Sequence, residues 1–248
     1  MTLLRCLPVV LVLCAFAFST SSAVAEEPMH GFVDKVYKDA DGKEYKYVLF
    51  IPHSYQKDKE FPLILFLHGS GEREGGAKAP VEVGLGPAIK KLGEKEFPFF
   101  VLFPQFSKNG NWEANGADAK RALAILDETR KNYNIDSHRL YLTGLSMGGR
   151  GTWSIAVSNP DMWAAIVPLC GWGDVNQADK IKSIPCWCFH GDKDNAVKVE
   201  KSREMIAALK AAGAEPKYDE YAGVGHNCWD KAYGTQELYD WLLKQSLK

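Results

Sequence analysis

The sequence Leu140-Tyr141-Leu142-Thr143-Gly144-Leu145-Ser146-Met147-Gly148-Gly149 decides the fold. It begins as a short apolar run typical of a buried strand and continues into a stretch that is compatible with a helix. Between the two lies a Gly-x-Ser-x-Gly pattern, which is typical of a nucleophile elbow. So tight a turn closes only if the residues two before and two after the serine lack a β-carbon. We therefore expect a strained turn that holds the Ser146 oxygen above the carboxyl edge of a sheet.

This turn would also place the Met147 amide at the first turn of a helix, where it can donate to a developing oxyanion. A five-residue pattern with two glycines also arises by chance, and its plain alternative is a glycine-rich turn with a solvent-facing serine. The rest of the chain has to distinguish the two interpretations.

The composition of the 248-residue chain fits one sizeable domain. Of its residues, 46% are hydrophobic and 12% are aromatic, which is enough for a large core. The formal net charge of −1 excludes the basic surface that nucleic acid or an anionic membrane would require. No Gly/Ser/Pro-rich linker interrupts the sequence, so we expect residues 26–248 to form a single domain.

The first 25 residues have the pattern of a secretory signal peptide. Arg5 is the only charged residue before Glu26, residues 7–18 are almost continuously apolar, and the segment ends in Ala23-Val24-Ala25. The apolar run is too short to span a bilayer comfortably, so we expect no stable membrane anchor. The pattern predicts cleavage near Ala25 and export to the periplasm or the extracellular space.

Four cysteines remain after such a cleavage: Cys170, Cys186, Cys188 and Cys228. An oxidising compartment permits disulfides, and Cys170 and Cys228 both fall in predicted loops at one edge of the sheet. A bridge between them and four buried free thiols are both compatible with the sequence. The Cys-x-Cys spacing lacks the second cysteine or histidine pair of a zinc site, so we expect no metal.

Apolar patterning predicts an α/β fold. Alternation in residues 32–37 and 44–51 indicates an N-terminal antiparallel hairpin, and the later strands alternate with helices, which implies a mostly parallel central sheet covered on both faces and carrying no large lid. The predicted later strands are residues 61–67, 97–103, 140–142, 163–169, 185–189 and 217–221, and the predicted helices are residues 116–134, 147–158, 198–212 and 236–243.

A serine nucleophile needs a base and an acid that orients the base. Only His190 and His226 follow Ser146 in the chain, and His226 lies in a glycine-rich loop just after a predicted strand. We expect His226 to be the base and interpret His190 as a structural residue at a strand end. Two aspartates, Asp192 and Asp194, follow the strand 185–189; Asp194 could instead be only a helix N-cap.

An oxyanion hole is expected from the loop after strand 61–67, which reads His68-Gly69-Ser70-Gly71-Glu72-Arg73. Its two glycines let backbone amides approach a carbonyl, so Ser70 or Gly71 would supply one donor beside Met147. We interpret His68 as a brace for this loop. Glu72 and Arg73 are expected to form a local ion pair, with a substrate carboxylate as the alternative partner of the arginine.

These motifs resemble the compact exported α/β-hydrolases. Leu-His-Gly-Ser-Gly-Glu, Gly-Leu-Ser-Met-Gly-Gly, His-Gly-Asp-Lys-Asp-Asn-Ala-Val and Gly-His-Asn-Cys-Trp are similar to segments of phospholipase/carboxylesterase-like, dienelactone-hydrolase-like, polyhydroxybutyrate-depolymerase-like and feruloyl-esterase-like proteins, and of relatives labelled as peptidases. The resemblance covers nearly all of residues 26–248 and implies an α/β-hydrolase fold with a triad. In prolyl-oligopeptidase-like relatives the acid lies four residues after the histidine of His-Gly-x-x-Asp, which favours Asp194. Dienelactone hydrolases themselves use a cysteine nucleophile, so Ser146 argues against that exact activity.

The sequence thus predicts a serine hydrolase that cleaves carboxylic esters through an acyl-enzyme, with no metal or organic cofactor. A cleft without a lid suits a small or extended ester substrate. Three tryptophans, Trp112, Trp172 and Trp229, are expected near this cleft, where they would either stack on substrate or simply pack. The alternatives are a serine peptidase that acts on short peptides and a non-catalytic binding module of the same fold. The oligomeric state is left open.

Overall fold

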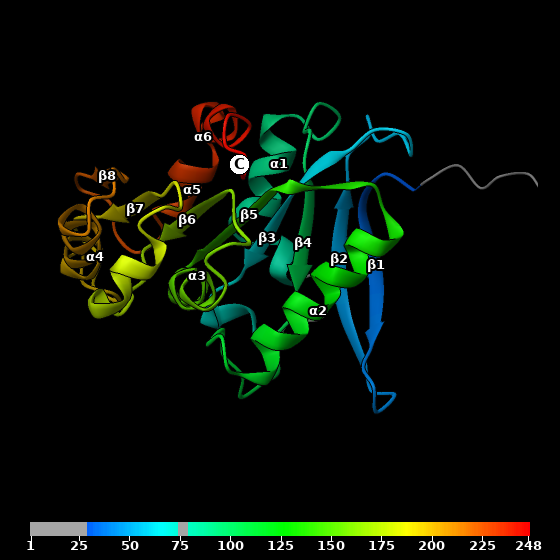
Figure 1. Cartoon of the computed structure of the whole chain (residues 1–248), viewed down its shortest axis with the longest axis horizontal. Helices are drawn as coiled ribbons and strands as arrows, with labels where there is room; N and C mark the ends of the chain where they lie inside the picture. The colour runs from blue at the N-terminus through cyan, green and yellow to red at the C-terminus, as the bar shows by residue number, and fades with distance from the viewer. Residues whose placement is uncertain (1–28, 74–78) are drawn as a thin grey trace, which may run out of the picture.

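Eight strands form one sheet in the order β1-β2-β4-β3-β5-β6-β7-β8 in the computed structural model, which describes residues 29–73 and 79–248 (Figure 1). The first two strands form an antiparallel hairpin, β2 also pairs antiparallel with β4, and all later neighbours pair in parallel. The strands are β1 (Gly31–Lys38), β2 (Glu44–Ile51), β3 (Phe61–Leu67), β4 (Phe100–Pro104), β5 (Ile135–Leu145), β6 (Ala165–Leu169), β7 (Trp187–Gly191) and β8 (Lys217–Tyr221).

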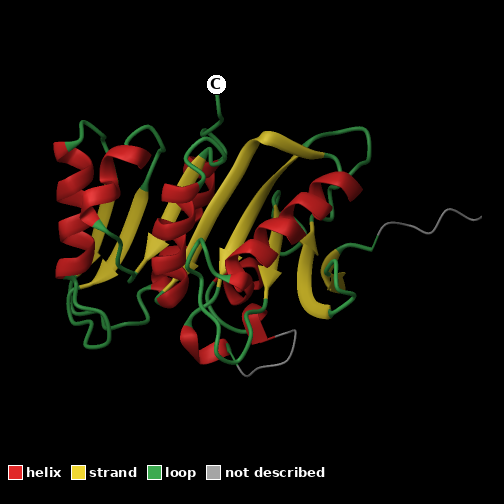
Figure 2. Cartoon of the chain, turned by 60° about the horizontal axis from the view of Figure 1, so that its bottom comes forward, coloured by secondary structure: helices red, strands yellow, loops and turns green. Residues whose placement is uncertain are grey.

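Helices cover both faces of the sheet (Figures 1 and 2). One core cluster lies between the sheet and α2 (Ala117–Asn132), α3 (Met147–Ser158) and α4 (Glu200–Ala211). The other lies between the sheet and α1 (Leu85–Leu92), α5 (Trp229–Tyr233) and α6 (Gln236–Leu242). The expected α/β architecture, with its N-terminal hairpin and mostly parallel sheet, is confirmed.

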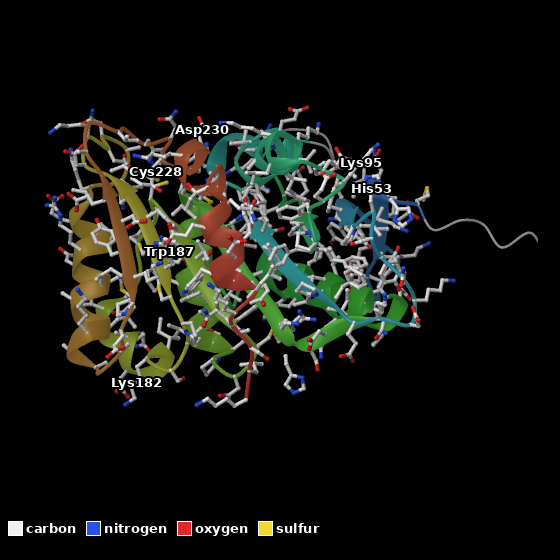
Figure 3. All side chains as sticks on the ribbon, turned by 90° about the horizontal axis from the view of Figure 1, so that it is seen from above. His53, Lys95, Lys182, Trp187, Cys228 and Asp230 are labelled. Atoms are coloured by element: carbon white, nitrogen blue, oxygen red, sulfur yellow. The ribbon has the colours of Figure 1, made fainter. Side chains whose placement is uncertain are left out.

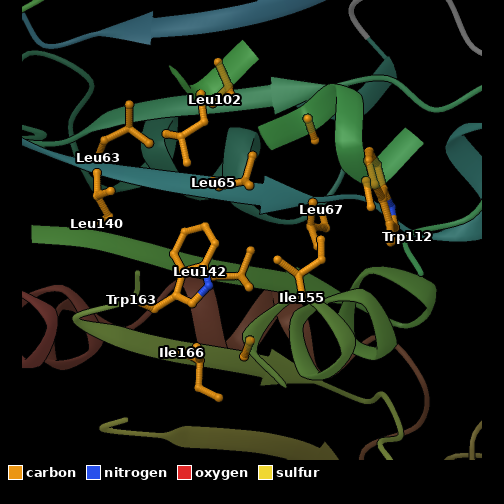
Figure 4. Close-up of a cluster of buried hydrophobic side chains, with 14 of the residues drawn as sticks. Leu63, Leu65, Leu67, Leu102, Trp112, Leu140, Leu142, Ile155, Trp163 and Ile166 are labelled. Carbon is orange, nitrogen blue, oxygen red and sulfur yellow. The ribbon is translucent and has the colours of Figure 1, made fainter. Parts of the chain in front are cut away.

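Strand β3 shows why the continuous apolar runs predicted buried strands. Successive side chains of a strand point to opposite faces. Leu63, Leu65 and Leu67 therefore enter the core beneath α2 and α3 (Figure 4), while Ile64 and Phe66 enter the core on the other face. A strand buried on both faces has no side that faces solvent, so its sequence does not alternate between apolar and polar residues.

The predicted boundaries differ from the structure in a few places. Strand β5 begins at Ile135 rather than Leu140, and β4 begins at Phe100 rather than Phe97. Among the described residues, the α-helices α1 and α5 were not predicted. The first turn of α1 contains Gly86 and Pro87, which lower helix propensity although proline is tolerated there. The short α5 begins just after Cys228, in a segment expected to be a loop (Figure 3).

The predicted signal peptide, residues 1–25, lies outside the described residues. Within residues 29–73 and 79–248, no helix is both long enough and apolar enough to cross a bilayer.

Candidate active site

Ser146 lies in a strained turn between β5 and α3. Its φ of 56° and ψ of −115° fall outside the regions that side chains prefer. A β-carbon added to Gly144 would lie 2.7 Å from the carbonyl oxygen of Leu67, and one added to Gly148 would collide with the same oxygen. Glycine is therefore sterically required at both positions. The turn has the geometry that the Gly-x-Ser-x-Gly pattern predicts.

His226 joins this serine to a buried carboxylate. The Ser146 Oγ lies 2.9 Å from His226 Nε2, and His226 Nδ1 lies 2.6 Å from Asp194 Oδ2. The three side chains come from three loops at the carboxyl ends of β5, β7 and β8. Parallel strands bring such ends to one edge of the sheet. The structure thus brings together residues that are 48 and 32 positions apart.

Asp194 is held by four hydrogen bonds. Its Oδ1 accepts from the backbone amides of Ala196, at 2.8 Å, and Val197, at 2.9 Å, while Oδ2 accepts from His226 and, at 3.1 Å, from His190 Nε2. Burial by itself raises the pKa of this carboxyl, but the hydrogen bonds from His226 and the two amides outweigh it, so the pKa lies below its usual value. Asp194 is therefore a fixed anion that faces the imidazole.

His190 is a second, fully buried imidazole against the same carboxylate. Its Nε2 donates to Asp194 and to the carbonyl of Val197, and its Nδ1 lies 2.7 Å from Ser202 Oγ. The sequence alone predicts only a structural residue at a strand end for His190. Its spacing of four from Asp194 was visible in the sequence, but nothing local indicated that the two side chains meet.

Asp192, the other acidic candidate, lies away from the imidazoles. Its Oδ1 accepts from the backbone amide of Gly223 at 2.6 Å. This bond holds the loop that carries His226. The tertiary structure therefore separates the two aspartates: Asp194 bonds the His226 ring, and Asp192 bonds the backbone of the loop that carries His226.

The loop after β3 is braced from below by His68, as expected. His68 is fully buried; its Nδ1 donates to the carbonyl of Gly69 at 2.8 Å, and its Nε2 accepts from the amide of Phe106 at 3.3 Å. Burial lowers the pKa of His68 to about 4, so its ring is neutral at neutral pH. The loop then continues into a 3₁₀ turn in which Ser70 and Gly71 are exposed.

The expected ion pair between Glu72 and Arg73 is not formed. Arg73 Nη2 lies 3.5 Å from the sulfur of Met147, and the guanidinium carbon lies 5.5 Å from the centre of the Phe106 ring. Glu72 instead approaches His68 Nδ1 at 3.8 Å, and burial raises the pKa of this carboxyl. Arg73 thus lies beside Met147, the residue that follows Ser146.

The three tryptophans differ in their surroundings. Trp112 is 1% exposed and donates its Nε1–H to the carbonyl of His68 at 2.9 Å, so most of its surface is packed. Trp229 lies edge-on against the His226 ring, with the two ring centres 5.3 Å apart. Trp172 is partly exposed and lines two cavities beside the elbow. Substrate binding by these residues stays a prediction.

All four described cysteines are free and buried, so no bridge joins Cys170 to Cys228. Burial raises the pKa of the Cys170 thiol well above its usual value, which keeps it protonated. Its sulfur, the Asp194 carboxylate and the His226 ring offer atoms within 4.8 Å of one another. Asp194 and His226 are hydrogen-bonded to each other, so this donor set is already engaged.

Comparison with known proteins gives a consistent result. Residues 46–233 match the Dienelactone hydrolase family. The chain is 27% identical over 142 residues to the bifunctional acetylxylan esterase/xylanase XynS20E of Neocallimastix patriciarum, which covers 56% of this chain and 20% of that protein. It is 30% identical over 122 residues to the poly(3-hydroxyalkanoate) depolymerase C of Paucimonas lemoignei, which covers 44% of this chain and 28% of that protein. These alignments span about a third or less of the length of the two relatives.

Among solved structures, a thermostable esterase superposes with a TM-score of 0.80 at 35% sequence identity. The alignment covers 87% of this chain and 63% of that one. The family match over residues 46–233 includes the elbow, the Asp194 loop and the His226 loop. The chain therefore belongs to the dienelactone hydrolase family, within the α/β-hydrolases.

Proposed function

We propose that this protein is a serine hydrolase that cleaves carboxylic esters through an acyl-enzyme. The observation that carries the proposal is the continuous hydrogen-bond chain from Ser146 Oγ through His226 to Asp194, with distances of 2.9 and 2.6 Å. In this order His226 removes the hydroxyl proton as Ser146 attacks the ester carbonyl, and Asp194 stabilises the imidazolium that forms.

The tetrahedral oxyanion would be held by the Met147 amide and by an amide of the Ser70–Gly71 turn. His226 then returns the proton to the leaving alcohol oxygen. The alcohol departs, a water molecule attacks the acyl-enzyme with His226 as the base, and the acid product leaves Ser146 restored. The low pKa of Asp194 supports this cycle because the carboxylate stays ionised throughout.

Two observations favour esters over peptides. The two relatives named above are a bifunctional acetylxylan esterase/xylanase and a poly(3-hydroxyalkanoate) depolymerase. The similar solved structure is an esterase. The peptidases of similar fold share only 14 and 15% sequence identity with this chain, which supports the fold alone. The two relatives differ in the ester that their names specify, so the proposal is made for carboxylic esters as a class.

The test is labelling with a fluorophosphonate probe together with a panel of p-nitrophenyl esters and aminoacyl p-nitroanilides. We expect stoichiometric labelling and ester turnover in the wild type, and loss of both in Ser146→Ala, with about 10⁴-fold or more lost from kcat. Gln245→Ala, in a cavity bounded by Lys182 and Trp241, is the matched control and should behave as the wild type. An unlabelled wild type would refute the mechanism, and amide turnover equal to ester turnover would favour the peptidase.

We also propose that residues 1–25 direct export and are removed after Ala25, leaving residues 26–248 as one domain. The support is the apolar run and the Ala-x-Ala pattern of the sequence. Expression with the native N-terminus in a bacterial host should yield a periplasmic or secreted protein. Its N-terminal sequence should begin at Glu26; retention of Met1 in the exported protein would contradict the cleavage.

A further inference from the structure

Two cavities adjoin on one side of the elbow. The nearer one, of about 210 Å³, is bounded by Met147, which directly follows Ser146, and by Arg73 and Trp112. The farther one, of about 280 Å³, extends over α3 to Asp174 and Gln177. Both share the residues Glu113, Arg150 and Trp172 as a wall. We call this pair of cavities the Trp172 groove; it leads away from the nucleophile along α3.

The residues of the shared wall hold one another in place through direct contacts. Arg150 lies one helical turn after Ser146, its Nε is ion-paired with the Glu113 carboxylate, and its guanidinium carbon lies 5.1 Å from the centre of the Trp172 ring. Ser154 Oγ lies 3.3 Å from the other oxygen of Glu113. These contacts fix the indole and both charged groups. The side chains of Arg150 and Glu113 nevertheless remain 45% and 31% exposed, so their outer polar atoms can bind a ligand.

The lining of the groove has a distinctive chemistry. Besides Trp172, it presents planar polar side chains at both ends, with Asn111 near the elbow and Asp174 and Gln177 at the far end. Carboxylate, amide and guanidinium groups pair with neighbouring hydroxyls because they offer two acceptors or donors in one plane. An indole offers a flat apolar face to the C–H face of a sugar ring. The farther cavity also contains the apolar side chains Trp153 and Val157, so the lining combines apolar surface with a few polar groups, as the faces and the hydroxyls of a sugar ring require.

We propose that the Trp172 groove binds a pyranose ring, so that the ester cleaved at Ser146 is an acylated sugar whose sugar is the leaving alcohol. This inference rests on the proposed function. Ser146 Oγ bonds to the acyl carbon, the bond from that carbon to the sugar oxygen breaks, and the sugar oxygen takes the proton held by His226. Water then releases the acid, so one ester and one water give one acid and one sugar hydroxyl.

The chemistry of the sugar decides that it forms the alcohol side of the ester. A neutral pyranose carries hydroxyls and no carboxyl group, so it enters a carboxylic ester as the alcohol. In the proposed complex the sugar oxygen that leaves takes its proton from His226, and the ring extends past Met147 into the groove. Arg150 and Glu113 would then contact hydroxyls on the ring in the nearer cavity. Asp174 and Gln177 would contact a second ring joined to the first.

The experiment measures acetate release from monoacetylated methyl glucoside and methyl xyloside, with p-nitrophenyl acetate as a sugar-free ester. In Trp172→Ala we expect KM for the acetylated glycosides to rise about tenfold, since loss of a stacked tryptophan removes a large part of the binding energy. The kcat/KM for p-nitrophenyl acetate should change by less than about twofold. Trp172→Phe keeps a flat ring and should recover most of the loss, which also controls for folding.

Gln177→Ala should weaken turnover of an acetylated disaccharide more than that of a monosaccharide, and Gln245→Ala should alter neither. Equal effects of Trp172→Ala on sugar and sugar-free esters would overturn the inference. So would a Trp172-dependent preference for methyl esters of hydroxycinnamic acids, which would assign the groove to an aromatic acyl group.

A different result would contradict the proposed function itself: a wild type that hydrolyses neither p-nitrophenyl acetate nor the acetylated glycosides. In that event, titration of wild type, Trp172→Ala and Trp172→Phe with methyl glucoside and cellobiose, followed by saturation-transfer NMR, still decides the groove. Binding by the wild type and by Trp172→Phe, but not by Trp172→Ala, supports a sugar site. Absence of binding by the wild type overturns it.

Discussion

At the scale of single residues, His68 braces the loop after β3 and also makes the stability of the protein depend on pH. Its ring is buried and neutral, because burial lowers its pKa from the ordinary value of 6.5 to about 4. Between these values the unfolded chain binds a proton that the folded chain does not. This part of the stability is therefore complete above about pH 6.5 and is lost as the pH falls towards 4.

We predict that the free energy of unfolding falls by about 3 kcal/mol between pH 7 and pH 4 on account of this one group. His68→Gln keeps a polar side chain but cannot take up the proton, so its unfolding free energy should depend less on pH over the same interval. Urea unfolding at a series of pH values measures both slopes. Identical slopes in the two proteins would show that His68 does not titrate in this way.

At Gly148 the structure excludes a side chain of any kind, whatever its polarity. Any β-carbon there would collide with the carbonyl of Leu67, which belongs to the neighbouring strand and cannot move independently. We predict that Gly148→Ala lowers the free energy of unfolding by about 3 kcal/mol or more. Gly71→Ala is the matched control, because no heavy atom lies within 4 Å of its added carbon, and it should change stability by less than about 0.5 kcal/mol. Similar losses in both variants would contradict the steric explanation.

At the scale of elements, the connection from β7 to α4 positions the acid. His190 at the end of β7 bonds Asp194, and Ser202 in α4 bonds the other nitrogen of His190. The aspartate is thus tied to a strand and a helix that are both packed in the core. A loop alone would leave the carboxylate free to rotate away from His226.

We predict that His190→Phe lowers kcat about tenfold or more while KM changes little, because one charge-assisted hydrogen bond to Asp194 is lost. Ser202→Ala leaves the His190–Asp194 bond in place and should have a smaller effect on kcat. Steady-state kinetics, with thermal unfolding as a check on folding, distinguish the two. A KM effect without a kcat effect in His190→Phe would place this residue outside the orientation of the triad.

At the scale of the whole molecule, the thiols are protected by the core rather than by bridges. Cys170, Cys186, Cys188 and Cys228 are all buried, and burial raises the pKa of Cys170, Cys186 and Cys188. We predict that Ellman's reagent reacts slowly with the native protein of residues 26–248 and fully in 8 M urea without a reductant, and that dithiothreitol leaves Tm unchanged. A Tm lowered by dithiothreitol would show that a disulfide forms after all.

Local patterning was sufficient for most of the fold. Continuous apolar runs predicted the buried strands, helical spacing predicted α2 and α4, and the two glycines around Ser146 predicted the elbow, because each of these constraints acts over a few neighbouring residues. The boundaries of β5 and the presence of α1 and α5 were less accessible. Those depend on packing against the sheet, which outweighs weak propensity in short segments such as Gly86-Pro87.

The candidate site likewise has features that the sequence predicts and features that only the folded structure shows. The sequence by itself determined the chemical groups, namely a serine on a strained turn, a histidine in a late glycine-rich loop and an acid after a buried strand. The family resemblance favoured Asp194 over Asp192, but only the tertiary structure decided that the Asp194 carboxylate bonds His226 and His190. It alone also decided that Glu113 meets Arg150 and Trp172 in one wall. The reason is physical: side-chain type is local, whereas hydrogen-bond partners and cavities arise from strand ends that lie tens of residues apart in the chain and meet only at the edge of the folded sheet.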